Sequence, residues 1–475
     1  MQQIIHNINN IFNIDNSIVD EYNELLNKNI IINKDINDKI KKMLELTLSD
    51  SGIYYKYNFL IQFYNIFKEL YENNIHKNYI LDLSIIDNKT SKNNECIFLN
   101  KLLCFYFIIK IMSNERTGIE SITSEINISE FINNKFTFNN SCPHFILYIT
   151  QIQNIKNKFF QYNIATNNNI GLIYHNINSW IITIHTKKYK INNLKSLLIC
   201  LCKNDTLLDH EYVSNLIYNI LFQIIYSLCA LSKYNINHND LRSENILLQN
   251  GYTYNNNVDN YKITVDNQVF NFFVPNYGFK IKIIDYGMSY SDNIETLQNP
   301  LIKYCELLNS AGLYNIYSNI YDIHCIINEI YIKMHPVYGN SSICKFMEQI
   351  INTKYIGTNK NNIYINEYWR LGFPLTIKYL IEKTNIAILK NIKLTYDENN
   401  KLIITDELRE NLIKHLLEIS REKNLSKAII NNIIDPLDNN INMILSPIEA
   451  IKLFTNYQIE PLSGINIIDS YAIDL

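Results

Sequence analysis

The sequence predicts an α+β protein in which a small β-rich unit is followed by a larger helical unit. Between residues 78 and 193, apolar residues come mostly in short runs separated by polar turns, which is typical of strands. In residues 194–475 they recur mainly at the helical spacing of three and four residues. Residues 1–77 also have helical periodicity, interrupted by Asn-rich joints, so we expect a helical N-terminal extension.

The individual elements can be placed by the same patterns of apolar residues. We find no internal repeat and no long hydrophilic linker that would separate further domains. The expected elements are helices at 36–48 and 59–71, strands between 79 and 112, a helix at 119–134, strands at 145–152 and 171–185, and, among the later helices, a hairpin insertion within 250–280 (runs 261–265 and 269–274) followed by a strand at 279–284.

Charge and composition exclude some classes of function. The chain has 475 residues, with 43 Lys and Arg against 46 Asp and Glu, a formal net charge of −3. An electrostatic nucleic-acid binder would have a basic excess, so we expect no nucleic-acid partner. With 47% hydrophobic and 19% charged residues, the chain has enough apolar material for a buried core.

Glycine is scarce. The chain has 11 glycines and 8 prolines, and average usage predicts roughly three times as many glycines. Asn, Ile, Lys and Tyr take their place, and because these residues share AT-rich codons, genome composition explains the bias. A mechanism that needs a glycine-rich loop must therefore find its glycines at few positions.

The sequence predicts an intracellular protein without a membrane span. The first ten residues lack the basic and apolar regions of a secretory signal, and nine cysteines without metal-ligand spacing suit a reducing compartment. Residues 212–232 carry no charge and are long enough to cross a bilayer. However, one face repeats polar residues every four positions, and we expect this face to meet solvent. These residues are Asn215, Asn219, Gln223 and Ser227.

Two segments carry the residues that phosphoryl transfer requires. His238–Leu248 reads HNDLRSENILL, and Asp285-Tyr286-Gly287 follows an apolar strand. Transfer from ATP needs a carboxylate to orient the attacking hydroxyl, oxygen ligands for Mg²⁺, and a cation on the phosphates. Asp240 and Asn245, five residues apart on a loop, can supply a base and a metal ligand.

The first segment resembles the catalytic loop HRDLxxxN of protein kinases, with Asn239 in place of the Arg, and the second resembles their DFG. The resemblance implies a bilobal kinase-like fold, ATP and Mg²⁺ as cofactors, and a protein substrate. It implies that Asp240 is the catalytic base and that Asn245 and Asp285 bind Mg²⁺. Arg242 stands where serine/threonine kinases usually have a Lys that contacts the transferred phosphate.

The kinase resemblance also implies a phosphate-binding Lys on a strand, paired with a Glu on the next helix. Lys110 is the one charge within the apolar run 105–111, and Glu125 is the better candidate partner, with Glu130 second. Alternatively, Lys110 faces solvent on an edge strand. Residues 86–96, where kinases have a glycine-rich loop, contain no glycine, which weakens the expected grip on ATP.

Further matches extend the resemblance over about residues 80 to 460. Asp322 heads an apolar helix, like the kinase helix whose Asp braces the catalytic loop, although an N-cap role is the alternative. Residues 446–451 are similar to the last-helix pattern of kinase domains. With residues 141–145 (SCPHF) and the hairpin before Asp285, the chain resembles protein kinases of large DNA viruses, such as the poxvirus virion kinases and giant-virus kinases, which implies the host cytoplasm or the virion as its location.

Three functions therefore compete. The first is a serine/threonine protein kinase, and the second is a catalytically weak pseudokinase scaffold that keeps the fold. The third is a small-molecule kinase of the aminoglycoside or choline type, which shares HxDxxxxN but not the Gly after the metal-binding Asp. Convergence of Lys110, Glu125, Asp240, Asn245 and Asp285 on one site would favour an active kinase.

Overall fold

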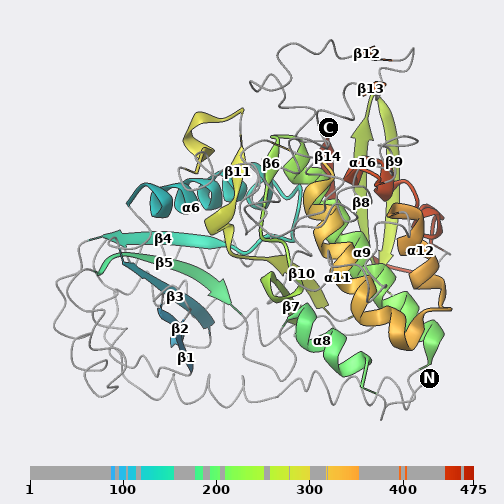
Figure 1. Cartoon of the computed structure of the whole chain (residues 1–475), viewed down its shortest axis with the longest axis horizontal. Helices are drawn as coiled ribbons and strands as arrows, with labels where there is room; N and C mark the ends of the chain where they lie inside the picture. Colours follow the sequence, from blue (N-terminus) through green and yellow to red (C-terminus); the bar gives the residue numbers. More distant parts are fainter. Residues whose placement is uncertain are drawn as a thin grey trace, which may run out of the picture.

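The chain has an α+β structure, in which a five-stranded sheet lies beside a group of helices (Figure 1). The predicted extension, residues 1–77, lies outside the described residues, and its helices and the three domain boundaries stay predictions. The computed structural model describes residues 87–90, 96–102, 105–113, 119–153, 177–185, 193–203, 209–250, 257–277, 279–291, 293–299, 317, 319–351, 395–396, 402–403, 444–461 and 465–475.

The five-stranded sheet has the order β1-β2-β3-β5-β4, with antiparallel pairing throughout. The strand character predicted for this region is confirmed, although the strand expected at 145–152 begins at Tyr148. β3 lies in the middle of the sheet, where Lys110 is in register with Ile97 on one side and Ile181 on the other. The strands are β1 (Asp87–Thr90), β2 (Cys96–Leu102), β3 (Phe105–Ser113), β4 (Tyr148–Gln153) and β5 (Ile177–His185).

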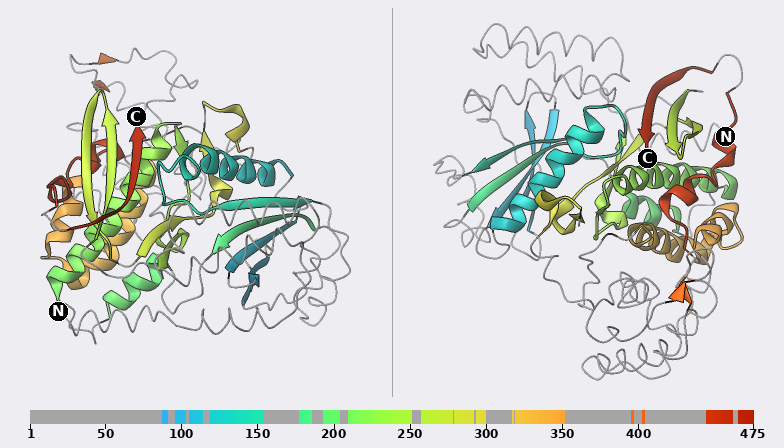
Figure 2. Two further views of the ribbon diagram at one scale, coloured as in Figure 1. Left: turned by 180° about the vertical axis from the view of Figure 1, so that it is seen from behind. Right: turned by 90° about the horizontal axis from the view of Figure 1, so that it is seen from above.

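A helix crosses this sheet, as Figure 2 shows in its right-hand view. Helix α6 (Ile119–Ile132) confirms the helix predicted at 119–134, and one π-helical turn, Asn133–Thr137, continues it. Ile128 and Ile132 are fully buried on its inner face. The side chain of Asn133 donates to the carbonyl of Tyr148 over 2.5 Å, so the turn after α6 is bonded to the start of β4.

The central helix of the second part is α9 (His210–Ser232), and α11, α12 and α16 all pack against it. Asp209 caps its N-terminus by accepting a hydrogen bond from the backbone of Glu211. Among the described residues, α9 is the helix long and apolar enough to cross a membrane, but 89% of its most apolar window is buried in the protein. The other helices are α8 (Leu194–Leu201), α11 (Tyr321–Tyr338), α12 (Ser342–Ile350) and α16 (Pro447–Ile451).

The polar face of α9 does not meet solvent as predicted. Asn215 is exposed, but the other three polar side chains of the stripe are buried. The Asn219 amide donates to the carbonyl of Pro275, and Gln223 accepts from the backbone N–H of Ile281 over 2.9 Å. The prediction was wrong because periodicity shows that a face is polar, not that water is its partner. Here the partner is the backbone of the following strands.

The predicted hairpin is present and gains a strand from the other end of the chain. β8 (Val258–Val265) pairs antiparallel with β9 (Gln268–Pro275). β10 (Phe279–Ile283) pairs with β7 (Ile246–Asn250), which follows the loop of His238. The last strand, β14 (Ile467–Asp474), pairs parallel with β8 (Figure 2), so the expectation of helices to the end of the chain was wrong. Parallel pairing of such distant segments leaves no local signal.

Asn and Asp take the backbone positions that glycine usually occupies. The turn between β8 and β9 consists of Asp266 and Asn267, with φ of 48° and 66°. Two consecutive residues with positive φ match the right-handed twist of a hairpin, and Asn and Asp tolerate this conformation better than other residues with a Cβ. Among the described residues, the non-glycine positions with positive φ are all Asn or Asp. The scarcity of glycine is therefore partly offset by the abundance of Asn.

A buried lysine joins the C-terminal strand to β10. Lys280 has its ammonium 2.9 Å from a carboxylate oxygen of Asp469 on β14 and 3.5 Å from one of Asp259 on β8. The hydroxyl of Tyr471 lies 2.5 Å away. Burial raises the pKa of Asp259 to about 6, although the Lys280 charge acts in the opposite direction. Since an unpaired buried charge is costly, Asp469 and hence β14 are needed beside β8 and β10.

A second buried lysine, Lys282, lies two residues further along β10. Its ammonium donates to the carbonyl of Pro143, in the segment between α6 and β4. Burial, together with the nearby Lys280 charge, lowers the pKa of Lys282 to about 7. The same segment is bonded to β10 through the backbone, because Ile283 donates to the carbonyl of His144 over 2.7 Å. β10 is thus bonded both to the C-terminal strand and to the chain that follows α6.

We predict that Asp469→Asn lowers the free energy of unfolding by roughly 3 kcal/mol, because it leaves Lys280 with less negative charge in a buried site. Urea unfolding followed by circular dichroism measures this difference. Asp474→Asn on the exposed side of the same strand is the matched control. Equal stability of the two variants would contradict the role given to Lys280.

We predict that Lys282 makes the protein more stable as the pH rises from 7 to 9. The unfolded chain keeps the lysine proton up to an ordinary pKa of about 10.5, whereas the folded protein loses it near 7. The unfolded state then binds more protons, so the free energy of unfolding rises with pH, by about 2 kcal/mol over this range. In Lys282→Met this rise is lost, and in the exposed-site control Lys262→Met it persists. Urea unfolding at pH 7 and pH 9 measures the free energy of unfolding of each protein. The prediction is contradicted if this free energy changes with pH by the same amount in wild type and in Lys282→Met.

Candidate active site

The loop that follows α9 brings Asp240 and Asn245 together. The chain passes from β6 (Ile236–Asn237) through residues 238–242 into a short 3₁₀ turn, Ser243–Asn245, and then into β7. The Asn245 amide donates to a carboxylate oxygen of Asp240 over 3.1 Å and to its backbone carbonyl over 2.9 Å. The two residues that the sequence predicted as base and metal ligand therefore share one rim of the loop.

Asp322 supports this loop from α11. Its two carboxylate oxygens accept the backbone N–H groups of His238, over 2.6 Å, and of Asn239, over 2.9 Å. The carboxyl is buried, which raises its pKa, while both hydrogen bonds favour the charged form. It makes no N-cap hydrogen bond, since the N-cap position of α11 belongs to Ile320. The predicted bracing role is confirmed, and the N-cap alternative was wrong.

Asp285 is held near the same loop because the residue before it, Ile284, is bonded to the loop. Ile284 donates its N–H to the carbonyl of Asn245 over 3.0 Å, and its own carbonyl lies 2.9 Å from a ring nitrogen of His238. Asp285 itself is exposed and left-handed, with φ of 68° and ψ of 71°. Asp285 thus directly follows the residue that is bonded to Asn245, two residues beyond the end of β10. His238 is buried, and this contact with Ile284 gives it a structural place in the loop.

Glu125 reaches the same turn from α6. It is buried, and a Cβ added to Gly287 would lie 3.2 Å from its carboxylate oxygen and 3.5 Å from one of Asp285. A side chain at Gly287 would therefore press closely on the Glu125 carboxylate and only touch that of Asp285, so the absence of a side chain leaves room for the buried Glu125. Glu130, the second candidate, is exposed.

Lys110 is placed only by its strand. β3 is central, so the edge-strand alternative is wrong, but the side chain of Lys110 lies outside the described residues. The hairpin of β1 and β2 flanks β3, and the glycine-free residues between them, 91–95, are likewise outside. Of the five residues expected to converge, the structure brings together Glu125, Asp240, Asn245 and Asp285, and the contact of Lys110 stays a prediction.

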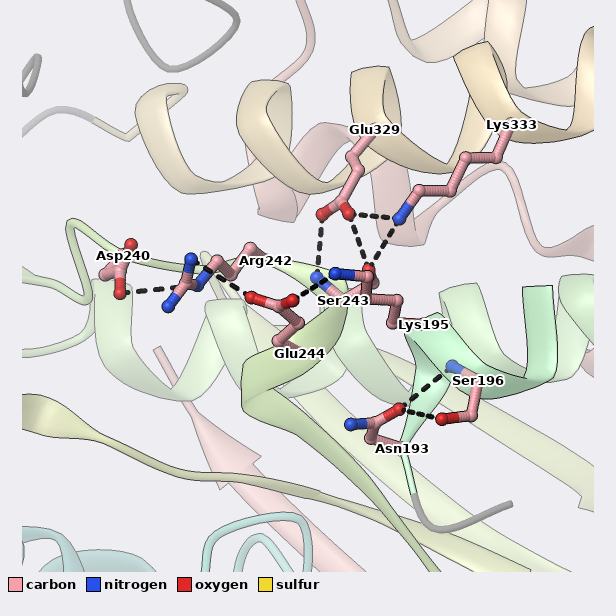
Figure 3. Close-up of polar contacts among 9 residues, drawn as sticks. All are labelled: Asn193, Lys195, Ser196, Asp240, Arg242, Ser243, Glu244, Glu329 and Lys333. Carbon is pink, nitrogen blue, oxygen red and sulfur yellow. Dashed lines mark hydrogen bonds and ion pairs between the residues drawn. The ribbon is translucent and has the colours of Figure 1, made fainter. Parts of the chain in front are cut away.

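Arg242 connects Asp240 to a network of charges (Figure 3). Its guanidinium lies 3.6 Å from a carboxylate oxygen of Asp240 and 3.0 Å from one of Glu244. Glu244 also pairs with Lys195 of α8, whose hydrogen bond is the main cause of its lowered pKa. Arg242 is thus held beside the predicted base and stays partly accessible.

The sequence analysis missed a second support of the loop, formed by Ser243, Glu329 and Lys333. Glu329 accepts the backbone N–H of Ser243 over 2.7 Å and its hydroxyl over 2.5 Å, and Lys333 donates to the same hydroxyl (Figure 3). Glu329 and Lys333 are four residues apart on α11, a spacing that forms ion pairs on a helix. That spacing was the available signal, but it does not indicate Ser243 as the partner.

The donor set near the loop suits Mg²⁺ better than a transition metal. Asp285 offers an exposed carboxylate and Asn245 an amide oxygen, and Mg²⁺ prefers such oxygens with substrate phosphates completing its shell. In the described part of the chain, no group of three or more His, Cys, Asp or Glu side chains could hold a metal ion by itself.

Comparison with known proteins gives structural neighbours only. No family model matches the sequence, and no curated protein matches it. A Plasmodium kinase domain is similar to the chain with a TM-score of 0.33 and 16% identity, over 78% of this chain and 95% of that one. The kinase PK-1 of Cydia pomonella granulovirus is similar with a TM-score of 0.26 and 15% identity, over 46% of this chain and 56% of that one. Both neighbours are kinases, but at these TM-scores the function must be argued from the site itself.

We predict that Asp322→Ala lowers the free energy of unfolding by about 3 kcal/mol, because two buried N–H groups lose their acceptor. Urea unfolding followed by circular dichroism gives the value. Glu130→Ala, an exposed carboxyl on α6, is expected to change stability by less than about 0.5 kcal/mol. A loss no greater than that of this control would show that Asp322 does not support the loop.

Proposed function

We propose that the chain is a kinase that transfers the terminal phosphoryl group of ATP, with Mg²⁺, to a hydroxyl group of a protein. The observation that carries the proposal is the meeting of Asp240, Asn245 and the turn of Asp285. These come from two chain segments, and the N–H of Ile284 bonds them at the carbonyl of Asn245. Phosphoryl transfer depends mainly on positioning and electrostatics, so an arrangement of this kind is its main requirement.

Asp240 is proposed as the base that orients the acceptor. Its carboxylate accepts from the Asn245 amide on one side and faces Arg242 on the other, so its rotamer is restrained. A carboxylate held in this way can accept the proton of a serine or threonine hydroxyl as the oxygen bonds to phosphorus. Arg242 is proposed to neutralise charge that develops on the transferred group, which its partial exposure permits.

Asn245 and Asp285 are proposed to hold Mg²⁺ through their side-chain oxygens. When bound, the ion neutralises charge on the phosphates and keeps them in line with the acceptor. Asn245 uses its amide N–H₂ toward Asp240, which turns its oxygen away from that carboxylate. Asp285 lies just beyond β10, next to Ile284, whose N–H is bonded to the loop. Its left-handed backbone projects the carboxylate from this end of the strand.

Glu125 and Lys110 are proposed as the pair that grips the α- and β-phosphates. The argument rests on two placements: Glu125 is buried beside Gly287, and Lys110 lies on the central strand β3 of the sheet that α6 covers. A buried carboxylate in this position favours a cationic partner. The glycine-free residues 86–96 would cover the phosphates less closely, so we expect weak ATP binding.

The class of acceptor follows from the kinase resemblance. Serine or threonine as the acceptor rests on Arg242 at the usual lysine position, and the motifs resemble those of protein kinases of large DNA viruses. An intracellular location is also a proposal. Six of the cysteines in the described part of the chain are free thiols, which agrees with a reducing compartment.

The proposal is tested by incubating the full chain with labelled ATP, Mg²⁺ and a generic protein substrate. We expect Asp240→Asn to lower phosphoryl transfer by about a hundredfold or more, because the amide cannot accept the proton. Asp266→Asn makes the same chemical change in the exposed turn between β8 and β9 and should transfer like wild type.

Each alternative has its own outcome in this experiment. No transfer and no nucleotide-dependent rise in melting temperature for wild type would support a pseudokinase scaffold. Transfer to a small alcohol such as choline or an aminoglycoside, with none to protein, would support a small-molecule kinase.

A further inference from the structure

The turn after Asp285 is held by side chains that bond two successive carbonyls. A left-handed Asp costs roughly 1–2 kcal/mol of backbone strain, so it persists only where its surroundings enforce it. The carbonyl of Gly287 accepts from the Asn299 amide over 2.8 Å, and that of Met288 accepts from the Asn239 amide over 3.0 Å. The Ser289 hydroxyl adds a bond to the carbonyl of His238. The turn is therefore held from the loop on one side and from Asn299 on the other.

Asn299 belongs to neither of the two kinase-like motifs, yet it is completely buried. A buried amide is costly unless it is bonded, so its bond to Gly287 is part of the reason for its position. The residues just before it, Glu295–Leu297, pack against α6, and Asn127 of α6 donates to the carbonyl of Thr296 over 3.1 Å. Asn299 thus couples the turn of Asp285 to the helix that carries Glu125.

The chemistry of this anchor is neutral. Asn239 stands where the protein kinases that the chain resembles have an Arg. The side chains of Asn299 and Asn239, which bond the carbonyls of Gly287 and Met288, are both amides. An amide fixes a carbonyl by direction and distance without adding charge beside Asp285, which must itself meet a cation. The turn can therefore be held in one geometry before a metal and nucleotide arrive.

We propose that Asn299 is a positioning residue for Asp285: by fixing the carbonyl of Gly287 it sets the direction of the Asp285 carboxylate toward Mg²⁺. The proposal rests on the function proposed above. It goes beyond it by assigning a role to a residue outside both motifs. Loss of a group that orients a metal ligand typically lowers metal affinity tenfold to a hundredfold.

The test measures metal binding rather than turnover. Mn²⁺ replaces Mg²⁺ as a paramagnetic probe, and its binding to the full chain is titrated by electron paramagnetic resonance with a non-hydrolysable ATP analogue present. We expect Asn299→Asp, which places an acceptor against the Gly287 carbonyl, to raise the dissociation constant for Mn²⁺ about tenfold. Gln298→Glu adds the same charge one residue away and should bind as wild type does. Asn299→Ala removes the bond without adding charge and gives the same direction of change if Asn299→Asp does not fold.

The outcomes separate the two proposals. A purely structural role would lower the melting temperature and the folded fraction, but the folded molecules would bind Mn²⁺ with unchanged affinity. If wild type binds Mn²⁺ with the analogue and both Asn299 variants bind it equally well, the positioning role is overturned. If the wild-type chain binds neither Mn²⁺ nor the ATP analogue, the proposed phosphoryl transfer is overturned.

Discussion

The two hydrogen bonds that Asp322 accepts are the constraint on which the site depends. They hold the N–H groups of His238 and Asn239, which cannot reach water, and so fix the backbone just before Asp240. Hydrogen bonds then connect Asp240 to Asn245 and Asn245 to Ile284, and Ile284 is the residue before Asp285. Each step is a direct hydrogen bond, so the position of Asp285 depends on the backbone that Asp322 holds.

Buried polar groups with assigned partners recur throughout the second part of the structure. Gln223 of α9 accepts from β10, Lys280 of β10 meets two carboxylates, and Lys282 meets the carbonyl of Pro143. Each of these groups would be costly if its partner moved away, so they fix the register of β10 in a way that apolar contacts cannot. β10 is followed by Ile284 and Asp285, so the contacts that hold β10 also affect the geometry of the site.

The abundance of asparagine has a structural use in this chain. Asn239 adopts a positive φ of 63° and at the same time donates to the carbonyl of Met288, so one residue supplies both a backbone conformation and an anchor. Glycine could supply the first but not the second, because it has no side-chain donor. Glycine stands at position 287, where a Cβ would come within 3.2 Å of the Glu125 carboxylate.

The sequence alone determined what is local. The spacing of Asp240 and Asn245, the apolar strand before Asp285, and the helix that carries Glu125 follow from neighbouring residues, as does Asp322 at the head of its helix. The tertiary structure alone decided the partners of Lys280, because Asp469 is distant in sequence and reaches it through a parallel strand. It likewise decided that Asn219 and Gln223 of α9 bond the backbones of β9 and β10 instead of water, and that Asn299 reaches Gly287. Periodicity reports the polarity of a face, but the partner of a polar group depends on segments that only folding brings together.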